Sequence, residues 1–229
     1  MEAIILAGGF GTRLKTVVSN VPKPMAPICG MPFLEILLRS LKTKGIDRVV
    51  LSVGYMAEKI ISYFGDCYQG VEIIYEQEDA PLGTGGAIRR ALTRCKSDHV
   101  FIFNGDTYAD LEVEALEAQW QRDKNPIIVA REVDDVTRFG LIELNGTRVA
   151  GFAEKSGEGA GVINAGCYVF PRPLLEKMTR DSFSLESDFL MKAVTLQHFD
   201  VFITSGAFID IGIPEEFERA QVDLREFTL

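Results

Sequence analysis

The sequence predicts an α/β fold in which a doubly wound, mixed but mainly parallel sheet carries helices on both faces. Up to residue 130, short apolar runs of strand length alternate with segments of helical periodicity, which is typical of right-handed βαβ crossovers. After that point, Asn145-Gly146 stands between two apolar runs and favours an antiparallel hairpin. Together the two patterns predict one Rossmann-like domain over all 229 residues.

The first 130 residues are predicted to alternate strictly between strands and helices. The first strand, residues 3–7, is wholly apolar and stops at two glycines. The first helix begins at Pro32, a residue favoured in the first helical turn, and ends before Gly45. The other predicted strands are 48–53, 72–75, 99–103 and 127–130, and the other predicted helices are 57–64, 87–95 and 113–122.

The rest of the chain is predicted to complete the same mixed sheet. The hairpin strands are 141–144 and 147–153, the further strands are 162–170, 201–204 and 207–210, and helices are expected near 186–197 and 214–224. Ser184 is a capping candidate for the first of these helices, so the segment 184–186 is assigned no catalytic role. His99 and His198 are too isolated for a metal site or a catalytic triad.

Composition limits the partners of the chain. The net charge of −9 argues against a nucleic-acid surface, which needs dense lysine and arginine. The first residues lack a basic segment, and their apolar run is too short for a signal peptide or a membrane span, so we expect a cytoplasmic protein without a membrane partner. Cys29, Cys67, Cys95 and Cys167 form no C-x-x-C pair and are expected to be buried small hydrophobic residues.

A glycine-rich loop follows the first strand and carries a cation. Residues 6–14 read Leu-Ala-Gly-Gly-Phe-Gly-Thr-Arg-Leu, at the strand end where open α/β sheets bind their ligands. Backbone N–H groups can approach phosphate oxygens there, and the Arg13 guanidinium can bind them. Leu14 stands where a dinucleotide fingerprint requires glycine, and the loop lacks the Gly-Lys-Ser/Thr of a Walker A motif. The loop therefore predicts phosphate binding of another kind.

Lys23 lies between two prolines within a stretch, from Ala3 to Leu34, that contains no acidic residue. The prolines stiffen the chain around the ammonium group. Since no carboxylate lies nearby in the sequence, we expect the cation to be unpaired. A buried strand followed by an ordinary loop with a solvated lysine would give the same composition, but the combination with the glycine loop favours a positive pocket for an anionic small molecule.

Two aspartates follow apolar strands. Asp106 comes after the strand 99–103, and Asp210 ends the strand 207–210. Carboxylates at one end of a sheet suit Mg²⁺, which binds through one or two carboxylates together with substrate phosphates. Each aspartate taken alone is equally well a helix cap or a turn former. Two such strand ends in one sheet favour a shared Mg²⁺ site.

Residues 6–14, followed by Pro22-Lys23-Pro24, resemble the signature of the sugar nucleotidyltransferases, an L-x-G-G-x-G-T-R-L loop with a downstream Lys-Pro. A second loop, residues 81–87, reads Pro-Leu-Gly-Thr-Gly-Gly-Ala and matches the element that recognises the nucleobase in this family. Its backbone can lie flat against a base, although a tight strand-helix turn would look the same. The resemblance covers nearly the whole chain and implies the nucleotide-diphospho-sugar transferase type of fold.

The resemblance implies a nucleotide-binding half, about residues 1–130, and a sugar-phosphate-binding half, about residues 131–229. The expected catalytic residues are Arg13, Lys23 and Asp106, and the expected Mg²⁺ ligands are Asp106 and Asp210. The expected nucleotide-binding residues are Leu6, Ala7, Gly8, Gly9, Gly11, Thr12, Glu78, Pro81, Gly83, Thr84 and Gly105. The expected sugar-phosphate-binding residues are Gly140, Glu154, Lys155 and Asn164.

Within the family, these segments are most similar to the D-glycero-D-manno-heptose 1-phosphate guanylyltransferases. This likeness implies transfer of GMP from GTP to the sugar 1-phosphate, with release of pyrophosphate, for surface polysaccharide biosynthesis. Glu78 agrees with GTP, because a carboxylate can accept both N–H groups of the guanine edge. Mannose-1-phosphate guanylyltransferases and N-acetylmuramate-1-phosphate uridylyltransferases share much of the pattern. The oligomeric state, monomer or homodimer, and the number of Mg²⁺ ions stay open.

Two other classes of function were weighed. A non-catalytic sugar-nucleotide sensor on the same fold would not need Arg13, Lys23 or a metal carboxylate, and the chain retains all of them. A dehydrogenase is disfavoured by Leu14, for the reason given above. The reaction expected from the sequence is therefore nucleotidyl transfer.

Overall fold

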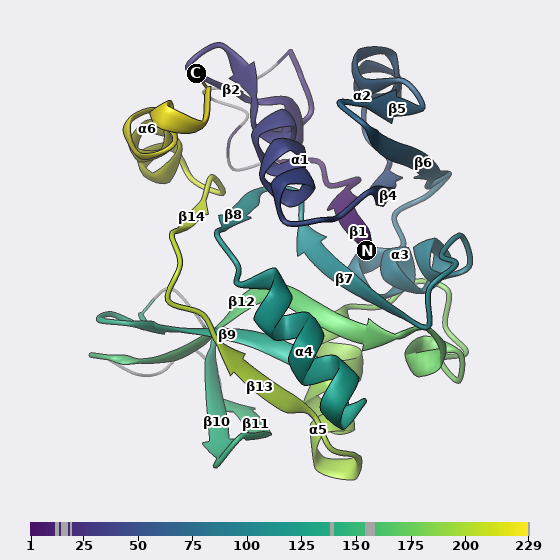
Figure 1. Cartoon of the computed structure of the whole chain (residues 1–229), viewed down its shortest axis with the longest axis vertical. Coiled ribbons are helices and arrows are strands. Elements are labelled where there is room, and N and C mark those ends of the chain that lie inside the picture. Colours follow the sequence, from purple (N-terminus) through teal and green to yellow (C-terminus); the bar gives the residue numbers. More distant parts are fainter. Residues whose placement is uncertain (12–13, 15–17, 19, 138–139, 154–158, 229) are drawn as a thin grey trace.

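The computed structural model describes residues 1–11, 14, 18, 20–137, 140–153 and 159–228. Four residues with sequence-predicted functions, Thr12, Arg13, Glu154 and Lys155, lie outside these ranges. Among the described residues, ten strands form one mixed sheet, in the order β10-β11-β13-β9-β12-β7-β1-β4-β6-β5 (Figure 1). None of the described helices is long and apolar enough to cross a bilayer.

The first half of the sheet is parallel. Its strands are β1 (Glu2–Ala7), β4 (Arg48–Val53), β6 (Val71–Gln77) and β7 (His99–Asn104), with the short antiparallel β5 (Cys67–Tyr68) at the edge. Leu6 pairs with Ser52 on one side and with Asn104 on the other, so these strands end at the same level. Every strand predicted in this part of the chain is confirmed, with shifts of one or two residues at some ends.

The second half of the sheet is largely antiparallel. Strand β12 (Gly161–Pro171) runs antiparallel to both β7 and β9 (Ile127–Val133), and β13 (Asp200–Ile203) runs parallel to β9. The predicted hairpin is present as β10 (Leu141–Asn145) and β11 (Arg148–Ala153). The mixed sheet predicted from the change of pattern after residue 130 is therefore confirmed. The prediction that it is mainly parallel is wrong, because β12 pairs antiparallel on both sides and the hairpin adds further antiparallel pairs.

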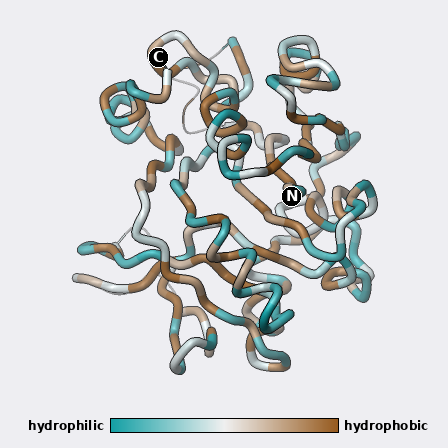
Figure 2. Tube along the Cα trace, in the orientation of Figure 1, coloured by the Kyte–Doolittle hydropathy of each residue, from teal (hydrophilic) through white to brown (hydrophobic). Residues whose placement is uncertain are grey.

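Helices cover both faces of the sheet because neighbouring strand residues point to opposite sides. On one face, Ile5 and its neighbours pack against α1 (Phe33–Thr43), α2 (Ala57–Phe64) and α4 (Val113–Asp123). On the other, Ile4 and its neighbours pack against α3 (Gly83–Leu92) and α5 (Met191–Leu196). Figure 1 shows α4 and α5 crossing opposite faces of the sheet, and Figure 2 shows hydrophobic residues concentrated along the central strands between them.

A third, smaller core lies beside the end of the main sheet. Strand β14 (Phe208–Asp210) pairs antiparallel with β8 (Thr107–Ala109) in a separate two-stranded sheet, and α6 (Pro214–Asp223) packs on it. The prediction that 207–210 belongs to the main sheet is therefore wrong. The reason is that Ile209 and Ile211 bury themselves against Tyr108 in this third core, where the main sheet does not reach.

The remaining elements are short. They are the strands β2 (Pro27–Ile28) and β3 (Met31–Pro32), the 3₁₀ turns η2 (Lys23–Met25), η3 (Arg172–Leu175) and η5 (Arg225–Thr228), and the π-helix η4 (Leu185–Leu190). The helix predicted at 186–197 thus consists of η4 followed by α5, and Ser184 caps η4 by accepting a hydrogen bond from the Ser187 amide. Pro32 precedes α1 as its cap and is not its first residue.

Two of the four cysteines contradict the prediction that all are buried. Cys95 and Cys167 are buried, whereas Cys29 and Cys67 are exposed. Cys29 occupies the turn between β2 and β3 with a positive φ of 47°. Cys67 lies on the edge strand β5. Turns and sheet edges face solvent, so the hydrophobic character of these side chains did not decide their burial.

Candidate active site

A cavity of about 560 Å³ opens at the carboxyl ends of the parallel strands. Most of the residues predicted from the sequence to bind the nucleotide line it, namely Leu6, Ala7, Gly8, Gly9, Gly11, Glu78, Pro81, Gly83 and Thr84. Lys23 and Asp106 line it as well. Gly105 does not; its amide donates to the Leu6 carbonyl at 2.9 Å and thereby joins β7 to β1 at the cavity floor.

The glycines of the first loop allow two functional side chains to approach it closely. A Cβ atom on Gly8 would lie 2.7 Å from Glu78 Oε1, and one on Gly11 would lie 2.8 Å from Lys23 Cβ. Gly11 also has a φ of +55°, in the left-handed region that glycine adopts readily. The loop therefore packs closely against two side chains of the cavity lining, one of which carries a carboxylate and the other an ammonium group.

Lys23 and Asp106 line the cavity and Asp210 lies beside them, outside its lining; we call these three residues the charged corner. Lys23 Nζ lies 2.5 Å from Asp106 Oδ2 and 3.9 Å from Asp210 Oδ1. The Lys23 side chain is only 8% exposed, while the two carboxylates are about one-third exposed at 35% and 32%. The prediction that Lys23 is unpaired is wrong, because its partners come from distant parts of the chain and not from the neighbouring sequence.

The small sheet sets the spacing of the two aspartates. Asp210 is opposite Thr107 in the pairing of β14 with β8, and the Ile211 amide donates to the Asp106 carbonyl at 3.0 Å. The Gly212 amide donates to Asp210 Oδ1 at 2.8 Å and orients that carboxylate. Asp106 and Asp210 therefore lie side by side, as the sequence analysis predicted, although through a separate sheet.

The charged corner fits a magnesium ion by its donor chemistry. No group of three His, Cys, Asp or Glu side chains among the described residues is arranged to hold a metal alone. Mg²⁺ does not require one, because it is commonly bound through one or two carboxylates together with substrate phosphates and water. Asp106 and Asp210 supply two partly exposed carboxylates, and the Lys23 ammonium contact shows that a cation is accommodated between them.

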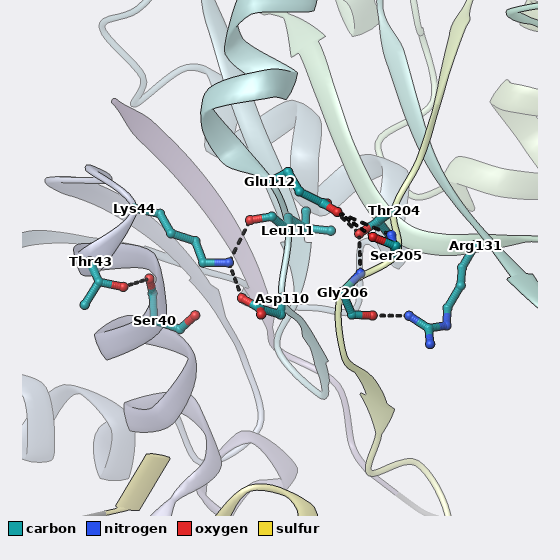
Figure 3. A network of polar contacts seen from close by, with 10 residues as sticks. All are labelled: Ser40, Thr43, Lys44, Asp110, Leu111, Glu112, Arg131, Thr204, Ser205 and Gly206. Carbon is teal, nitrogen blue, oxygen red and sulfur yellow. Dashed lines mark hydrogen bonds and ion pairs between the residues drawn. The ribbon is translucent and has the colours of Figure 1, made fainter. Parts of the chain in front are cut away.

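A polar network, which we call the clamp, holds the chain segment that leads to Asp210 (Figure 3). Glu112 accepts hydrogen bonds from the Thr204 hydroxyl at 2.7 Å and from the amide and hydroxyl of Ser205 at 3.3 and 3.2 Å. Arg131 donates to the Gly206 carbonyl. These residues, Glu112, Arg131, Thr204, Ser205 and Gly206, join α4 and β9 to the segment between β13 and β14.

The segment 110–111 directly precedes Glu112 of the clamp and is held in place by Lys44. Lys44 Nζ at the end of α1 lies 2.5 Å from Asp110 Oδ1 and donates to the Leu111 carbonyl at 2.7 Å (Figure 3). A Cβ atom on Gly206 would lie 1.9 Å from the Asp110 carbonyl oxygen, so only glycine permits this crossing. The charged corner thus depends on contacts among segments far apart in the sequence.

Glu78 and the start of α3 form the opposite wall. Glu78 Oε1 accepts from the Ser52 hydroxyl at 3.1 Å, and Oε2 accepts from the Leu82 amide at 3.0 Å. A carboxylate offers about four acceptor positions, so capacity for further donors exists beyond these two bonds. Glu78 therefore lines the cavity in an orientation that the Ser52 hydroxyl and the Leu82 amide hold in place.

The glycines of residues 83–86 pack against another segment of the protein on one side. They form the first turn of α3, and their open sides face the segment 181–183. A Cβ atom would lie 2.5 Å from the Phe183 carbonyl oxygen at Gly83, 2.1 Å from the Phe183 ring at Gly85 and 2.2 Å from the Asp181 carbonyl oxygen at Gly86. Protein therefore occupies these sides of the glycines, while Gly83 and Thr84 also line the cavity, so the contact of this loop with a base stays a prediction.

Two of the four residues predicted to bind the sugar phosphate, Gly140 and Asn164, belong to the described part of the chain. Asn164 sits at an irregularity in the pairing of β12 with β9, and its side-chain carbonyl accepts from the Gly166 amide at 2.9 Å. Leu141 pairs with Ile163, which places the preceding Gly140 near Asn164. Neither Gly140 nor Asn164 is among the residues that line the cavity of about 560 Å³. Glu154 and Lys155 fall outside the described residues, so their roles stay predictions.

Sequence reasoning missed several residues of the cavity wall, namely Phe10, Pro24, Gly54, Tyr55, Asp79, Ala80, Ala87, Asn104 and Gly212. The Phe10 ring is 52% exposed and its centroid lies 5.5 Å from that of Tyr55. An aromatic residue inside a glycine loop has no packing partner in its own segment, which could have indicated a ligand-facing position. Asn104 could have been found from its place directly before the Gly105-Asp106 motif.

The fold and the site define the class of protein. The nucleotidyl transferase family model matches residues 2–226, so the chain belongs to this family, as its motifs predicted.

Guanylyltransferases recur among the relatives of this chain. The chain is 41% identical over 229 residues to the D-glycero-alpha-D-manno-heptose 1-phosphate guanylyltransferase of Aneurinibacillus thermoaerophilus, covering 99% of this chain and 100% of that protein. The structure of this chain superposes with a TM-score of 0.86 on that of HddC from Yersinia pseudotuberculosis complexed with GMP-PN. The two are 39% identical, and the match covers 96% of this chain and 97% of that one. A mannose-1-phosphate guanylyltransferase of Mycobacterium tuberculosis is 32% identical, covering 98% of this chain and 64% of that protein.

Proposed function

We propose that this chain transfers GMP from GTP to D-glycero-α-D-manno-heptose 1-phosphate, in the cytoplasm, with release of pyrophosphate. Lys23 and Asp106 line a cavity that Glu78 also lines, with Asp210 beside Lys23, and this arrangement carries the proposal. One side of the cavity supplies charges for phosphates and the other supplies a carboxylate for a base. The similarity to heptose 1-phosphate guanylyltransferases supports the choice of the two substrates.

In the proposed reaction, an oxygen of the sugar 1-phosphate attacks the α-phosphorus of GTP. A new P–O bond forms, and the bond between the α-phosphorus and the bridging oxygen to the β-phosphate breaks, so pyrophosphate leaves. A phosphate monoester is already ionised at neutral pH, and the attack needs no strong general base. The main task of the protein is to hold two anions together and to stabilise charge on the leaving group.

Lys23 is suited to this task by its burial. An ammonium group that is 8% exposed acts through a medium of lower dielectric than water, so its attraction for phosphate oxygens is stronger there. Glycine-loop amides and Arg13, by its place in the sequence motif, are proposed to bind the triphosphate beside it. Asp106 and Asp210 are proposed to hold Mg²⁺, which supplies charge neutralisation between the phosphates when bound.

Glu78 is proposed to select guanine. Each of its oxygens accepts one hydrogen bond within the protein, from Ser52 and from the Leu82 amide. The remaining lone pairs can accept the N1–H and the 2-amino N–H of guanine, whereas uracil and cytosine offer no such neighbouring pair of donors in this arrangement. Asn164, Gly140, Glu154 and Lys155 are proposed to bind the sugar phosphate.

A pyrophosphate-release screen tests the proposal. The four common NTPs are paired with D-glycero-α-D-manno-heptose 1-phosphate, mannose 1-phosphate and N-acetylmuramate 1-phosphate, in the presence of Mg²⁺. We expect the highest kcat/KM for GTP with the heptose phosphate. A preference for mannose 1-phosphate, or for UTP with the muramate sugar, would replace the proposed substrates. Absence of turnover with every pair, together with binding of a GDP-sugar, would favour a sensor on the same fold.

A further inference from the structure

The segment 184–186, to which the sequence analysis gave no role beyond capping, contacts both sides of the candidate site. It begins the π-helix η4, a type of helix that is rare and often found at functional sites. Its Glu186 is partly buried between the start of α3 and strand β12. Thr84 on α3 lines the cavity, and Asn164 on β12 is the described side chain predicted to bind the sugar.

Three hydroxyl groups surround the Glu186 carboxylate. Oε2 lies 3.0 Å from Thr84 Oγ1 and 3.1 Å from Ser184 Oγ, and Oε1 lies 3.4 Å from the Tyr168 hydroxyl oxygen. The Leu185 amide donates to Thr84 Oγ1 at 2.8 Å, so the Thr84 proton is directed to Glu186. Because an ionised carboxylate can only accept, every hydroxyl in this group must donate to it.

That requirement fixes the direction of the next hydrogen bond. Tyr168 uses its proton for Glu186, so its oxygen accepts from Asn164 Nδ2 at 2.8 Å. Asn164 Oδ1 in turn accepts from the Gly166 amide at 2.9 Å. Both ends of the Asn164 amide are therefore assigned, and one N–H and one Oδ1 lone pair extend beyond these bonds. A donor and an acceptor side by side match two neighbouring hydroxyl groups of a sugar.

Tyr168 is well suited to transmit this direction. It is 2% exposed. Burial, and to a lesser extent the nearby charge of Glu186, raises the pKa of its hydroxyl well above the ordinary value of 10. The hydroxyl therefore keeps its proton at all working pH values. The hydrogen bonds from Asn164 through Tyr168 to Glu186 therefore have one fixed direction. Thr84 donates to the same carboxylate and connects it to the nucleotide side of the cavity.

We propose that Glu186 is a positioning residue for the sugar-phosphate subsite. By accepting hydrogen bonds from Tyr168 and Thr84, Glu186 orients the Asn164 amide toward the sugar hydroxyls and holds that amide at a fixed place relative to the nucleotide. This inference rests on the proposed function, since it assumes that Asn164 binds a sugar. It adds a residue that the sequence motifs did not assign and a reason for the orientation of one that they did.

Glu186→Gln is the central test, because glutamine has the same shape but its amide nitrogen donates. We expect the KM for the sugar 1-phosphate to rise about tenfold, which corresponds to the loss of one well-placed hydrogen bond, while the KM for GTP changes less than about twofold. Tyr168→Phe should raise the same KM, since Asn164 then loses its acceptor. Asp188→Asn is the matched control: it removes a carboxylate charge from η4, but its amide oxygen can still accept from the Ser184 amide.

The outcomes separate the inference from the proposed function. A wild-type protein without turnover on any GTP and sugar 1-phosphate pair would overturn both. An active wild type with an unchanged sugar KM in Glu186→Gln and Tyr168→Phe would overturn only the inference. A fall in Tm with equal losses for both substrates, in both variants, would make the network merely structural and would also overturn it. Should Glu186→Gln fail to fold, Tyr168→Phe decides by the same KM comparison.

Discussion

The two walls of the cavity are assembled in different ways. The wall that holds Gly8, Gly9 and Glu78 comes from strand ends in the parallel half of the main sheet, where each loop follows its own strand directly. The charged corner instead joins Asp106 to Asp210, which the chain reaches only after completing the antiparallel half and forming a separate small sheet. The first wall therefore depends on local segments, and the second depends on remote side chains that fix a crossing segment.

This difference predicts where substitutions act. Changes within the charged corner itself should remove chemistry and leave the fold intact. Changes in the packing of α3 should act on stability, and changes in the clamp should act on the geometry of the corner without touching a substrate.

The largest effect is expected from the charged corner. Asp106→Asn and Lys23→Ala should each lower kcat/KM by at least about a hundredfold, because each removes charge that stabilises the reacting phosphates. Their Tm values should stay close to that of the wild type. Lys192→Ala, at an exposed lysine on α5, is the control and should keep full activity. A wild-type rate in either corner variant would contradict the site assignment.

A stability effect is expected at the start of α3. Gly83 has a φ of +68°, and a Cβ atom there would lie 2.5 Å from the Phe183 carbonyl oxygen. Gly83→Ala should lower the free energy of unfolding by about 2–4 kcal/mol, from left-handed strain and overpacking together. Urea denaturation followed by circular dichroism measures this. Gly9→Ala is the control, because nothing lies within 4 Å of its Cβ position; equal stability losses in both would show that the contact with Phe183 is unimportant.

The smallest of the three effects is expected from the clamp. Glu112→Ala leaves the Thr204 hydroxyl and the Ser205 amide without their acceptor, so the segment leading to Asp210 can shift. We expect kcat to fall about tenfold, since small displacements of catalytic groups cost this much or more, and the Mg²⁺ concentration for half-maximal rate to rise. Thr204→Ser keeps the hydroxyl and serves as the control. An unchanged Mg²⁺ dependence with a lowered Tm would limit the clamp to a structural role.

The clamp also predicts a dependence of stability on pH. Burial by itself would raise the pKa of Glu112, but hydrogen bonds from Thr204 and Ser205 outweigh it, and the pKa lies below its ordinary value of 4.5. A carboxylate with a lowered pKa stabilises the folded state above its unfolded pKa, and this contribution is lost as the pH falls through the folded value. The difference in unfolding free energy between wild type and Glu112→Gln should therefore be present at pH 7 and shrink below about pH 4.

Two features follow from the residue pattern alone: the alternation of strands and helices, and the edge of the sheet at which the site lies. Apolar periodicity depends only on neighbouring residues. The carboxyl ends of parallel strands meet at one edge of the sheet, whatever the positions of the strands in the sequence. The glycine loop, Glu78 and Asp106 were therefore placed correctly at one cavity.

The partners of these residues are set by three-dimensional packing. Lys23 is ion-paired and not unpaired, the glycines of α3 pack against the segment 181–183, and Glu186 joins Thr84 to Tyr168. Each of these contacts joins residues far apart in the chain. Their closeness follows from the packing of elements that are distant in the sequence, which no local pattern of residue types specifies.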